Sequence, residues 1–212
     1  MRVGVIDYGV GNLGSVLRAL EELRVAPVLV NRAMDLHAND CLILPGVGNF
    51  ADCVRLLSAG GWQTALRDEV RGYGRPLLGI CVGMQLLADS STEGASEGGD
   101  ALGLGFIPGQ VRHLRSFGCN QRVPHVGWNG ITRTRTDDHL FDDIPDGTDF
   151  YFVHSYAFAP QHAGDVLATA DYGMPVTAAV RRGHVWGTQF HPEKSSRAGL
   201  RVLRNFIEGP TC

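Results

Sequence analysis

The first eighty residues alternate between two kinds of pattern, and this alternation restricts the folds open to the chain. Four short apolar runs, each bounded by glycine, proline or polar residues, are typical of buried strands. Three segments between them carry apolar residues at helical spacing. The apolar runs are residues 2–7, 26–30, 41–44 and 76–80, and the helical segments are residues 13–23, 50–58 and 62–73. Because strands that alternate with helices form parallel sheets covered by helices, the pattern predicts an α/β fold.

The second half of the chain is richer in predicted strands than the first. The segments expected to be strands are residues 110–114, 128–133, 150–154, 165–170, 177–181 and 184–189. Arg182 and Gly183 between the last two indicate a hairpin, and therefore antiparallel pairing. Residues 83–88 are expected to begin a helix, residues 90–105 to form a polar surface loop, and residues 197–208 to form an amphipathic helix. With no internal repeat and no long linker, residues 1–212 are expected to form one domain.

Composition excludes several classes of protein. The 19 Lys and Arg against 22 Asp and Glu give a net charge of -3, so we expect no nucleic-acid partner. No apolar stretch approaches the roughly 18 residues of a membrane span, so we expect no membrane association. The five cysteines are odd in number and lack C-x-x-C spacing. This disfavours a disulfide framework or a zinc site and favours a reducing, cytoplasmic setting.

Residues 77–85 (LLGICVGMQ) contain the strongest local signal. A buried strand ends at Cys81, which has Gly79 and Gly83 two positions to either side and a helix after it. This is the pattern of a nucleophile elbow, in which small neighbours permit a strained turn. The start of the following helix favours the reactive thiolate. The alternative, a small buried hydrophobe, is preferred for Cys41 and Cys53; Cys119 and Cys212 have no role that the sequence reveals.

A second signal lies in residues 189–194 (QFHPEK), at the end of a strand. A cysteine nucleophile needs a base, and histidine serves near neutral pH. Pro192 favours an extended backbone at His191, so the side chains of His191 and Glu193 can lie on one side. Glu193 could then orient the imidazole. The alternative is a surface histidine beside a solvated acid.

Two glycine-containing loops follow predicted strands. In residues 44–50 (LPGVGNF) the glycines allow an N–H group to approach a ligand, as the second donor of an oxyanion hole whose first donor is the Val82 N–H. An ordinary turn is an equal alternative. Residues 8–14 (YGVGNLG) lack the lysine of a P-loop, so we do not expect a nucleotide site there.

The other histidines show no metal-binding spacing, so we expect no metal site. They are His37, His113, His125, His139, His154, His162 and His184. His125 and His154 have apolar neighbours in the sequence and are expected to be core or interface residues. No cofactor is expected either.

The elbow and the QFHPE segment together resemble the class I (triad) glutamine amidotransferases. Residues 6–12, 44–50, 123–129 and 151–156 extend the resemblance to the glutaminase subunits of imidazole glycerol phosphate synthase, over nearly the whole chain. It implies a flavodoxin-like, mostly parallel sheet flanked by helices, with added antiparallel strands in the second half. Val82, where leucine is commoner, and Thr188, where valine is commoner, depart from the family pattern.

The resemblance also implies a reaction. Cys81 would attack the side-chain amide of glutamine, His191 would protonate the ammonia, and water would hydrolyse the thioester to glutamate. Other residues implied at the site are Gly48, Gln85, Glu93 and Ser155 for substrate binding, and Val47 and Val82 for the oxyanion N–H groups.

A partner is implied as well. In this family the ammonia passes to a (β/α)8-barrel cyclase subunit, which makes imidazole glycerol phosphate and aminoimidazole carboxamide ribonucleotide. Activity without the liganded partner is expected to be very low. The positions implied at the interface are Asn12, Trp128, Tyr151 and Lys194, and Tyr156 is a further aromatic anchor if it lies at the surface.

Three alternatives remain open at this point. The triad would serve equally well in an amidotransferase that feeds a paralogous synthase, for example in cell-surface sugar amidation. A Cys-His hydrolase working alone would not need a docking face with exposed aromatic side chains. A silent scaffolding protein is disfavoured because Cys81, His191 and Glu193 are all intact.

Overall fold

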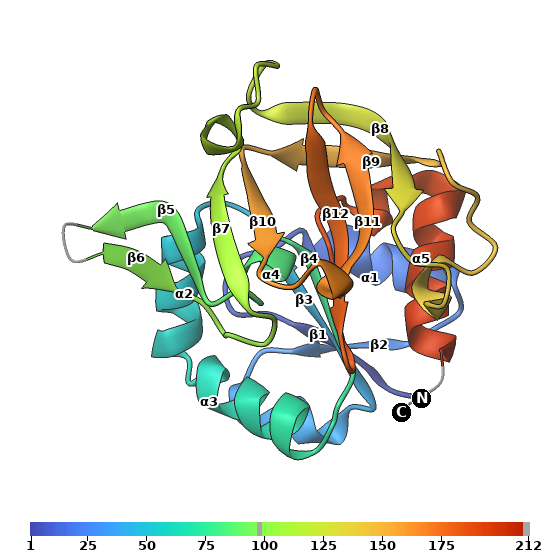
Figure 1. Ribbon diagram of the computed structural model, residues 1–212. Helices are drawn as coiled ribbons and strands as arrows, with labels where there is room; N and C mark the ends of the chain where they lie inside the picture. The colour runs from blue at the N-terminus through green and yellow to red at the C-terminus, as the bar shows by residue number, and fades with distance from the viewer. Residues whose placement is uncertain (97–98, 210–212) are drawn as a thin grey trace.

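The predicted parallel half of the sheet is present in the computed structural model, which describes residues 1–96 and 99–209. Its strands are β2 (Pro27–Val30), β1 (Val3–Ile6), β3 (Cys41–Gly46), β4 (Leu77–Cys81) and β13 (Val185–Thr188), in that spatial order and all parallel. The apolar runs of β1, β3, β4 and β13 are wholly buried because helices cover both faces of the sheet, whereas the edge strand β2 is partly exposed (Figure 1). This confirms the predicted α/β class.

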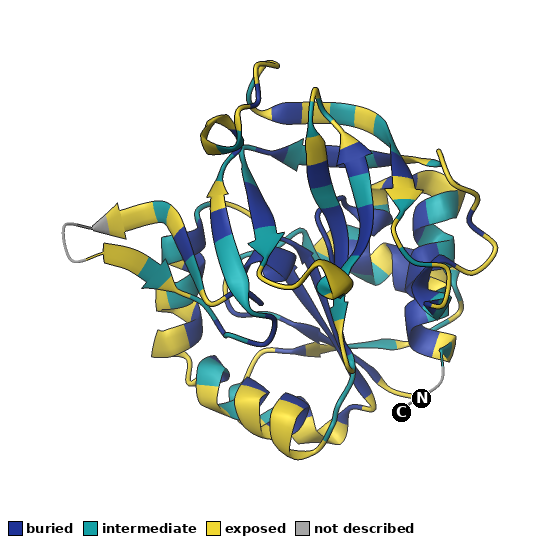
Figure 2. Cartoon of the chain, viewed as in Figure 1, coloured by how far each residue is buried: buried dark blue, intermediate teal, exposed yellow. Residues whose placement is uncertain are grey.

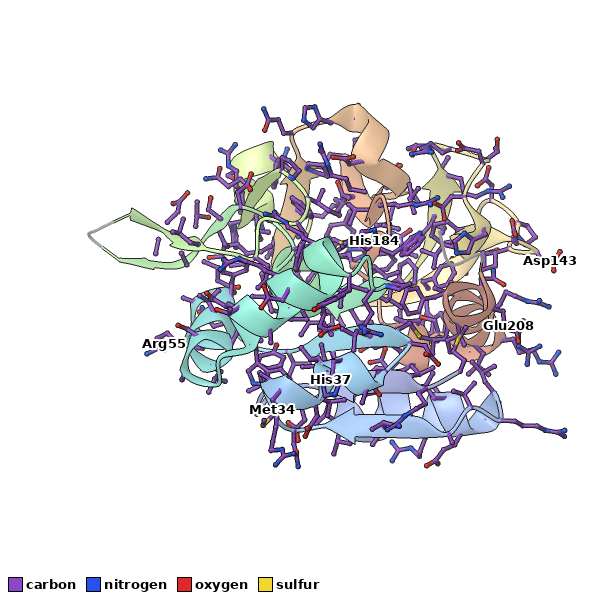
Figure 3. The ribbon with its side chains drawn as sticks, turned by 90° about the horizontal axis from the view of Figure 1, so that it is seen from below. Met34, His37, Arg55, Asp143, His184 and Glu208 are labelled. Atoms are coloured by element: carbon purple, nitrogen blue, oxygen red, sulfur yellow. The ribbon has the colours of Figure 1, made fainter. Side chains whose placement is uncertain are left out.

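The helices that cover the sheet fall into two groups. On one face α1 (Leu13–Glu22) packs against α5 (Ser196–Glu208), and on the other α2 (Phe50–Ala59) packs against α3 (Trp62–Arg67) (Figure 1). α3 runs on into a short π-helical segment, Asp68–Gly72, so the predicted helix 62–73 is present in two parts. Seen from below, Arg55 on α2 and Asp143 lie at opposite edges of the molecule (Figure 3).

Antiparallel strands extend the sheet beyond β13, as the second half of the sequence predicts. They are β12 (Pro175–Arg182), β11 (Val166–Asp171), β8 (His125–Arg133) and β9 (Asp149–His154). A second sheet contains β10 (Tyr156–Pro160), β7 (Gly109–His113), β5 (Ser90–Ser96) and β6 (Gly99–Leu102). Short 3-10 helices occupy Ala33–Ala38, Leu114–Phe117, His139–Phe141, Ala163–Asp165 and Pro192–Lys194.

The prediction of a loop over residues 90–105 was wrong, since β5 and β6 pair there as an antiparallel hairpin. The hairpin is mostly exposed, so its polar composition carries no apolar alternation, and its strands are held by backbone pairing and by packing on α2. Strand β10 was not predicted either. The expected helix from residue 83 is short, and α4 covers only Val82–Gln85.

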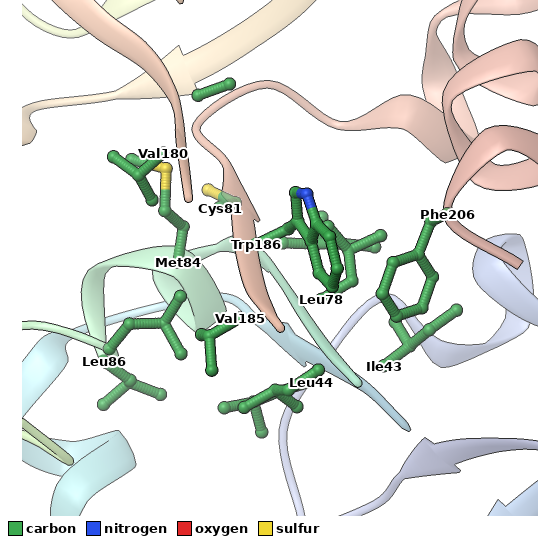
Figure 4. Packing of buried hydrophobic residues seen from close by; sticks show 14 of the residues in the cluster. Ile43, Leu44, Leu78, Cys81, Met84, Leu86, Val180, Val185, Trp186 and Phe206 are labelled. Atoms are coloured by element: carbon green, nitrogen blue, oxygen red, sulfur yellow. The ribbon is translucent and has the colours of Figure 1, made fainter. Parts of the chain in front are cut away.

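The core lies between the large sheet and its helices (Figure 2). Around β4 and β13 the apolar side chains include Leu78, Met84 and Trp186, and the Trp186 ring meets Phe206 of α5 edge-on at 5.7 Å (Figure 4). Among the described residues no helix is both long enough and apolar enough to cross a membrane.

Parallel pairing brings four loops together. The carboxyl ends of β1, β3, β4 and β13 lie at one edge of the sheet, so the segments that follow these strands are neighbours in space. In open α/β sheets this edge is where ligands bind.

Candidate active site

Cys81 ends β4 at a sharp turn into α4. Its backbone has φ +56° and ψ −113°, which a residue with a side chain rarely adopts. A Cβ atom at Gly79 would meet the Gly83 carbonyl oxygen at 2.5 Å, and a Cβ atom at Gly83 would collide with the Leu44 backbone. The two glycines therefore permit the close packing that holds the strained turn, as the elbow pattern predicts.

His191 follows β13 and lies between Cys81 and Glu193. Its Nδ1 atom lies 2.8 Å from Oε1 of Glu193, and both side chains are almost fully buried. Because a carboxylate accepts, Nδ1 carries the proton and Nε2 is the ring nitrogen left for Cys81. Burial by itself lowers the pKa of His191, but hydrogen bonds with Cys81 and Glu193 outweigh burial and raise this pKa to about 9. The arrangement can support nucleophilic catalysis by a thiolate.

Two amide side chains support this trio. Asn12, in the loop after β1, donates from Nδ2 to Oε1 of Glu193 at 3.1 Å. Gln189 places Nε2 at 3.8 Å from the Cys81 sulfur. Gln189 belongs to the QFHPE motif, but no role was predicted for it, because the motif does not reveal which way its amide points.

A cavity of about 330 Å³ opens beside Cys81, a volume suited to a small molecule. Its lining residues are Val47, Gly48, Cys81, Val82, Gln85, Glu93, Pro124, Val153, His154, Ser155, Tyr156 and His191. The structure thus brings together every predicted catalytic, oxyanion and substrate-binding residue except Glu193, which lies behind His191. Pro124 and Val153 were not predicted at the site, and His154 was predicted only as a core or interface residue.

The Glu93 carboxylate faces the cavity from the β5–β6 hairpin. Its Oε2 atom accepts a hydrogen bond from the Phe50 N–H at 2.9 Å, at the start of α2. Burial raises the pKa of Glu93, the Phe50 hydrogen bond opposes this rise, and the nearby Asp52 charge adds to it. An ammonium group in the cavity would offset the cost of burying this carboxylate.

Gln85 is buried in the cavity wall. Its Nε2 atom donates to the Tyr156 carbonyl and to Oε1 of Gln189, both at 3.0 Å. These two bonds fix the amide plane and connect α4 to the segment after β9, through Tyr156, and to the segment after β13, through Gln189. Ser155, the remaining predicted substrate-binding residue, lies in the segment after β9.

The predicted oxyanion donors approach the cavity from two sides. Val82 is the first residue of α4, where N–H groups have no partner within the helix. Val47 and Gly48 are exposed in the loop after β3, and the Val47 carbonyl accepts a hydrogen bond from the Cys53 thiol at 3.5 Å. This bond tethers the loop to α2.

The predicted interface residues gather next to the trio. Trp128 on β8 and Tyr151 on β9 are register partners whose rings meet edge-on at 6.1 Å. The Lys194 ammonium lies 5.9 Å from the Tyr151 ring centre, and Trp128 is 53% exposed. Tyr156, the further aromatic anchor considered, has a partly buried side chain that lines the cavity.

Cys41 and Cys53 were expected to be small buried core residues, and both are free and buried. Cys119, for which the sequence revealed no role, is also free and buried. Burial raises the pKa of Cys41 to about 12 and also raises that of Cys53. Cys212 lies outside the described residues.

His125 and His154 are buried, as expected. Within residues 1–96 and 99–209 no group of three or more His, Cys, Asp or Glu side chains is arranged to hold a metal ion.

Comparison with known proteins shows what the whole chain is similar to. The sequence matches the family described as Glutamine amidotransferase class-I over residues 4–209. Curated relatives named imidazole glycerol phosphate synthase subunit HisH include those of Moorella thermoacetica (46% identical, 97% of this chain and 94% of the relative) and Caulobacter vibrioides (47%, 97% and 97%). The relative from Halobacterium salinarum is 48% identical, and the match covers 96% of this chain and 91% of the relative.

Solved structures share the fold at lower identity. A glutamine amidotransferase crystal structure superimposes with a TM-score of 0.75 at 23% identity, covering 97% of both chains. A chain from the structure of PurLQS from Thermotoga maritima gives a TM-score of 0.72 at 17% identity, again covering 97% of both chains.

Proposed function

Because the chain belongs to the class-I glutamine amidotransferase family, and within it to the HisH subunits, we propose that it supplies ammonia from glutamine to a cyclase subunit of imidazole glycerol phosphate synthase. The observation that carries the proposal is the His191–Glu193 pair at 2.8 Å, beside a cysteine held in a nucleophile elbow at the mouth of a cavity.

The proposed reaction has two halves. The Cys81 thiolate attacks the amide carbon of glutamine, the C–N bond breaks, and His191 gives its proton to the departing ammonia. A γ-glutamyl thioester remains on Cys81. His191 then takes a proton from water, the resulting hydroxide attacks the thioester, and glutamate and the thiolate are released. The net change is glutamine and water to glutamate and ammonia.

Glu193 is proposed to orient His191 and to stabilise its cationic form. The carboxylate accepts from Nδ1, so Nε2 always faces Cys81. The Val82 and Val47 N–H groups are proposed to stabilise the oxyanion that forms on the amide oxygen during each half-reaction. Val82 keeps this capacity although leucine is commoner there, since the N–H is independent of the side chain.

The amino-acid end of glutamine is proposed to bind at the opposite end of the cavity. Glu93 would pair with the α-ammonium group, which would offset the cost of its partial burial. Gln85, Gly48 and Ser155 would complete the contacts, because all three line the same cavity.

The partner is proposed to dock on the face formed by Asn12, Trp128, Tyr151 and Lys194, which we name the docking face. Trp128 is an exposed tryptophan packed against Tyr151, whose ring also contacts Lys194, and exposed aromatic rings of this kind are typical of a protein interface centre. Asn12 joins this face to the Glu193 carboxylate, so ammonia released at Cys81 would start its passage to the (β/α)8-barrel cyclase here. The barrel would then form imidazole glycerol phosphate and aminoimidazole carboxamide ribonucleotide in the cytoplasm.

The test is glutamate production from glutamine, measured for the chain alone and with the cyclase subunit carrying its nucleotide substrate. Strong activation by the liganded cyclase is the expected result. Full activity without any partner would favour a hydrolase working alone. Absence of glutamate production in both conditions would contradict the assignment to this synthase.

A further inference from the structure

Two buried histidines face each other at the cavity wall, His154 lining the cavity and His125 lying behind it, and the proposed reaction gives neither a part. His125 on β8 and His154 on β9 are register partners, and His125 Nδ1 lies 3.1 Å from His154 Nε2. His125 also stacks on the rings of Phe152 and Tyr172, with centroid distances of 4.8 Å and 3.9 Å. The two rings are therefore held in fixed positions.

The direction of hydrogen bonding between these rings follows from the group at one end. His154 Nδ1 lies 2.8 Å from the Tyr156 carbonyl, which can only accept, so this nitrogen carries a proton. Burial lowers the pKa of His154 to about 3 and that of His125 to about 4, so both rings are neutral near pH 7. His154 Nε2 must then accept, and His125 Nδ1 must donate to it.

The same logic extends the chain of hydrogen bonds to Asn129. With its proton on Nδ1, His125 has an acceptor at Nε2, which lies 3.4 Å from Asn129 Nδ2. The Asn129 amide also donates to the Asp171 carbonyl at 2.8 Å, which identifies its nitrogen. We name the resulting one-way chain of donors, from Asn129 through His125 to His154, the histidine relay.

One end of the histidine relay is the wall of the cavity. The Tyr156 carbonyl accepts from His154 and also from Gln85 Nε2, at 2.8 Å and 3.0 Å. These two donors fix the backbone just after Ser155, and both Ser155 and Tyr156 line the cavity beside Cys81.

The other end of the histidine relay lies on the strand of the docking face. Residues on β8 alternate, so His125 and Asn129 face inward while Val126 and Trp128 face solvent at 55% and 53% exposure. The relay thus adds a side-chain hydrogen-bond connection from β8 to the pocket wall.

We propose that the histidine relay is a positioning device, which holds the wall formed by Ser155 and Tyr156 at the place that the amino-acid end of glutamine requires. The proposal rests on the proposed glutaminase function. The relay residues move no proton of the reaction; they act through the Tyr156 carbonyl.

The first test compares two substitutions at His154 in the complex with the liganded cyclase subunit. His154→Leu removes both ring nitrogens, whereas His154→Asn keeps a donor at the same number of bonds from Cα as Nδ1. We expect His154→Leu to raise KM for glutamine about tenfold with kcat changed about twofold, and His154→Asn to return KM to within about threefold of the wild-type value.

Phe141→Leu is the matched control, because Phe141 is a fully buried ring outside the cavity lining. Its KM should stay at the wild-type value. An unchanged KM in His154→Leu, or an equal rise in the Leu and Asn variants, would overturn the histidine relay. Absence of glutamine hydrolysis in the wild-type complex would instead contradict the proposed function.

A second test needs no substitution. In a chain labelled with nitrogen-15 histidine, we expect His125 and His154 to be neutral at pH 7 with the proton on Nδ1 in both rings. A spectrum showing either ring protonated on Nε2 would overturn the proposed direction of the relay and hence its action on Tyr156.

Discussion

Cys81 combines a positive φ with a full side chain, a strain on the order of 1–3 kcal/mol. Its strand is bonded on both sides, to β3 and to β13, which holds the turn in place. Alanine retains the same Cβ, so the strained turn and the docking face should survive the loss of the sulfur. This makes Cys81→Ala a clean probe of the thiol.

In the complex we expect Cys81→Ala to lower glutamine-dependent synthesis at least about a thousandfold, since no thioester can form. Synthesis from added ammonium salt should stay within about twofold of the wild-type rate, because the cyclase reaction does not use the thiol. Both rates can be read from cyclase product formation. Loss of both activities in a correctly assembled complex would contradict the division of labour.

Glu193 and His191 should differ in the size of their effects. Glu193→Gln keeps an oxygen for His191 Nδ1 but removes the charge that stabilises the imidazolium, whereas His191→Ala removes the proton carrier itself. We expect glutaminase kcat to fall about a hundredfold less in Glu193→Gln than in His191→Ala. The measurement is steady-state glutamate formation by the two variants. A larger fall in kcat in Glu193→Gln than in His191→Ala would mean that Glu193 itself moves protons.

At the scale of elements, the β5–β6 hairpin carries Glu93 to the cavity and packs on α2. Gly94 has φ +71°, and a Cβ atom there would lie 2.7 Å from both Ala51 Cβ and Asn49 Oδ1. Gly94→Ala should therefore push the hairpin away from α2 and raise KM for glutamine several-fold, on the order of 1 kcal/mol.

Gly99→Ala is the matched control for the hairpin. It also has a positive φ, +113°, but a Cβ atom there would have no neighbour within 4 Å. The control carries backbone strain without the collision, so its KM should stay near the wild-type value. Equal effects of the two variants would show that strain, not the approach to α2, is responsible.

The β8–β9 pair should make the protein sensitive to mild acid. The pKa values of His125 and His154 are about 4 and about 3, below the ordinary 6.5, so the unfolded chain takes up protons first as pH falls. Between pH 6.5 and 5, each histidine then lowers the free energy of unfolding by up to about 1.4 kcal/mol per pH unit. His191 does not oppose this loss, since the stability from its raised pKa is lost only as pH rises toward 9.

Urea unfolding at pH 6.5 and at pH 5 measures this loss of stability. His125→Gln should remove about half of the difference between the two pH values, because one of the two histidines is gone. A free energy of unfolding that is equal at both pH values in the wild type would contradict the argument.

At the scale of the molecule, Trp128 is expected to dominate partner binding. Trp128→Ala should weaken binding of the cyclase about tenfold or more, because a large exposed ring at an interface centre contributes most of the affinity. Tyr73→Ala removes a ring that is 77% exposed and lies outside the docking face, so it should change the Kd less than about twofold. Calorimetric titration of each variant with the cyclase measures the two Kd values. Equal losses of affinity in the two variants would contradict the proposed position of the docking face.

The parallel half of the sheet and the trio of Cys81, His191 and Glu193 could be predicted from the sequence. These features depend on local patterns: buried apolar runs, glycines two positions from a cysteine, and a proline between a histidine and a glutamate. Once the strands are parallel, their carboxyl ends must meet, so the loops that carry these residues become neighbours.

The β5–β6 hairpin and the histidine relay depend on tertiary contacts and could not be predicted from the sequence. The hairpin is stabilised by backbone pairing and by contact with α2, and neither leaves an apolar alternation in the sequence. The relay joins His125 to His154, 29 positions apart, and its proton direction follows from the Tyr156 carbonyl and from burial. Hydrogen-bond direction is a property of assembled neighbours, which is why two histidines with the sequence pattern of ordinary core residues become the wall support of the site.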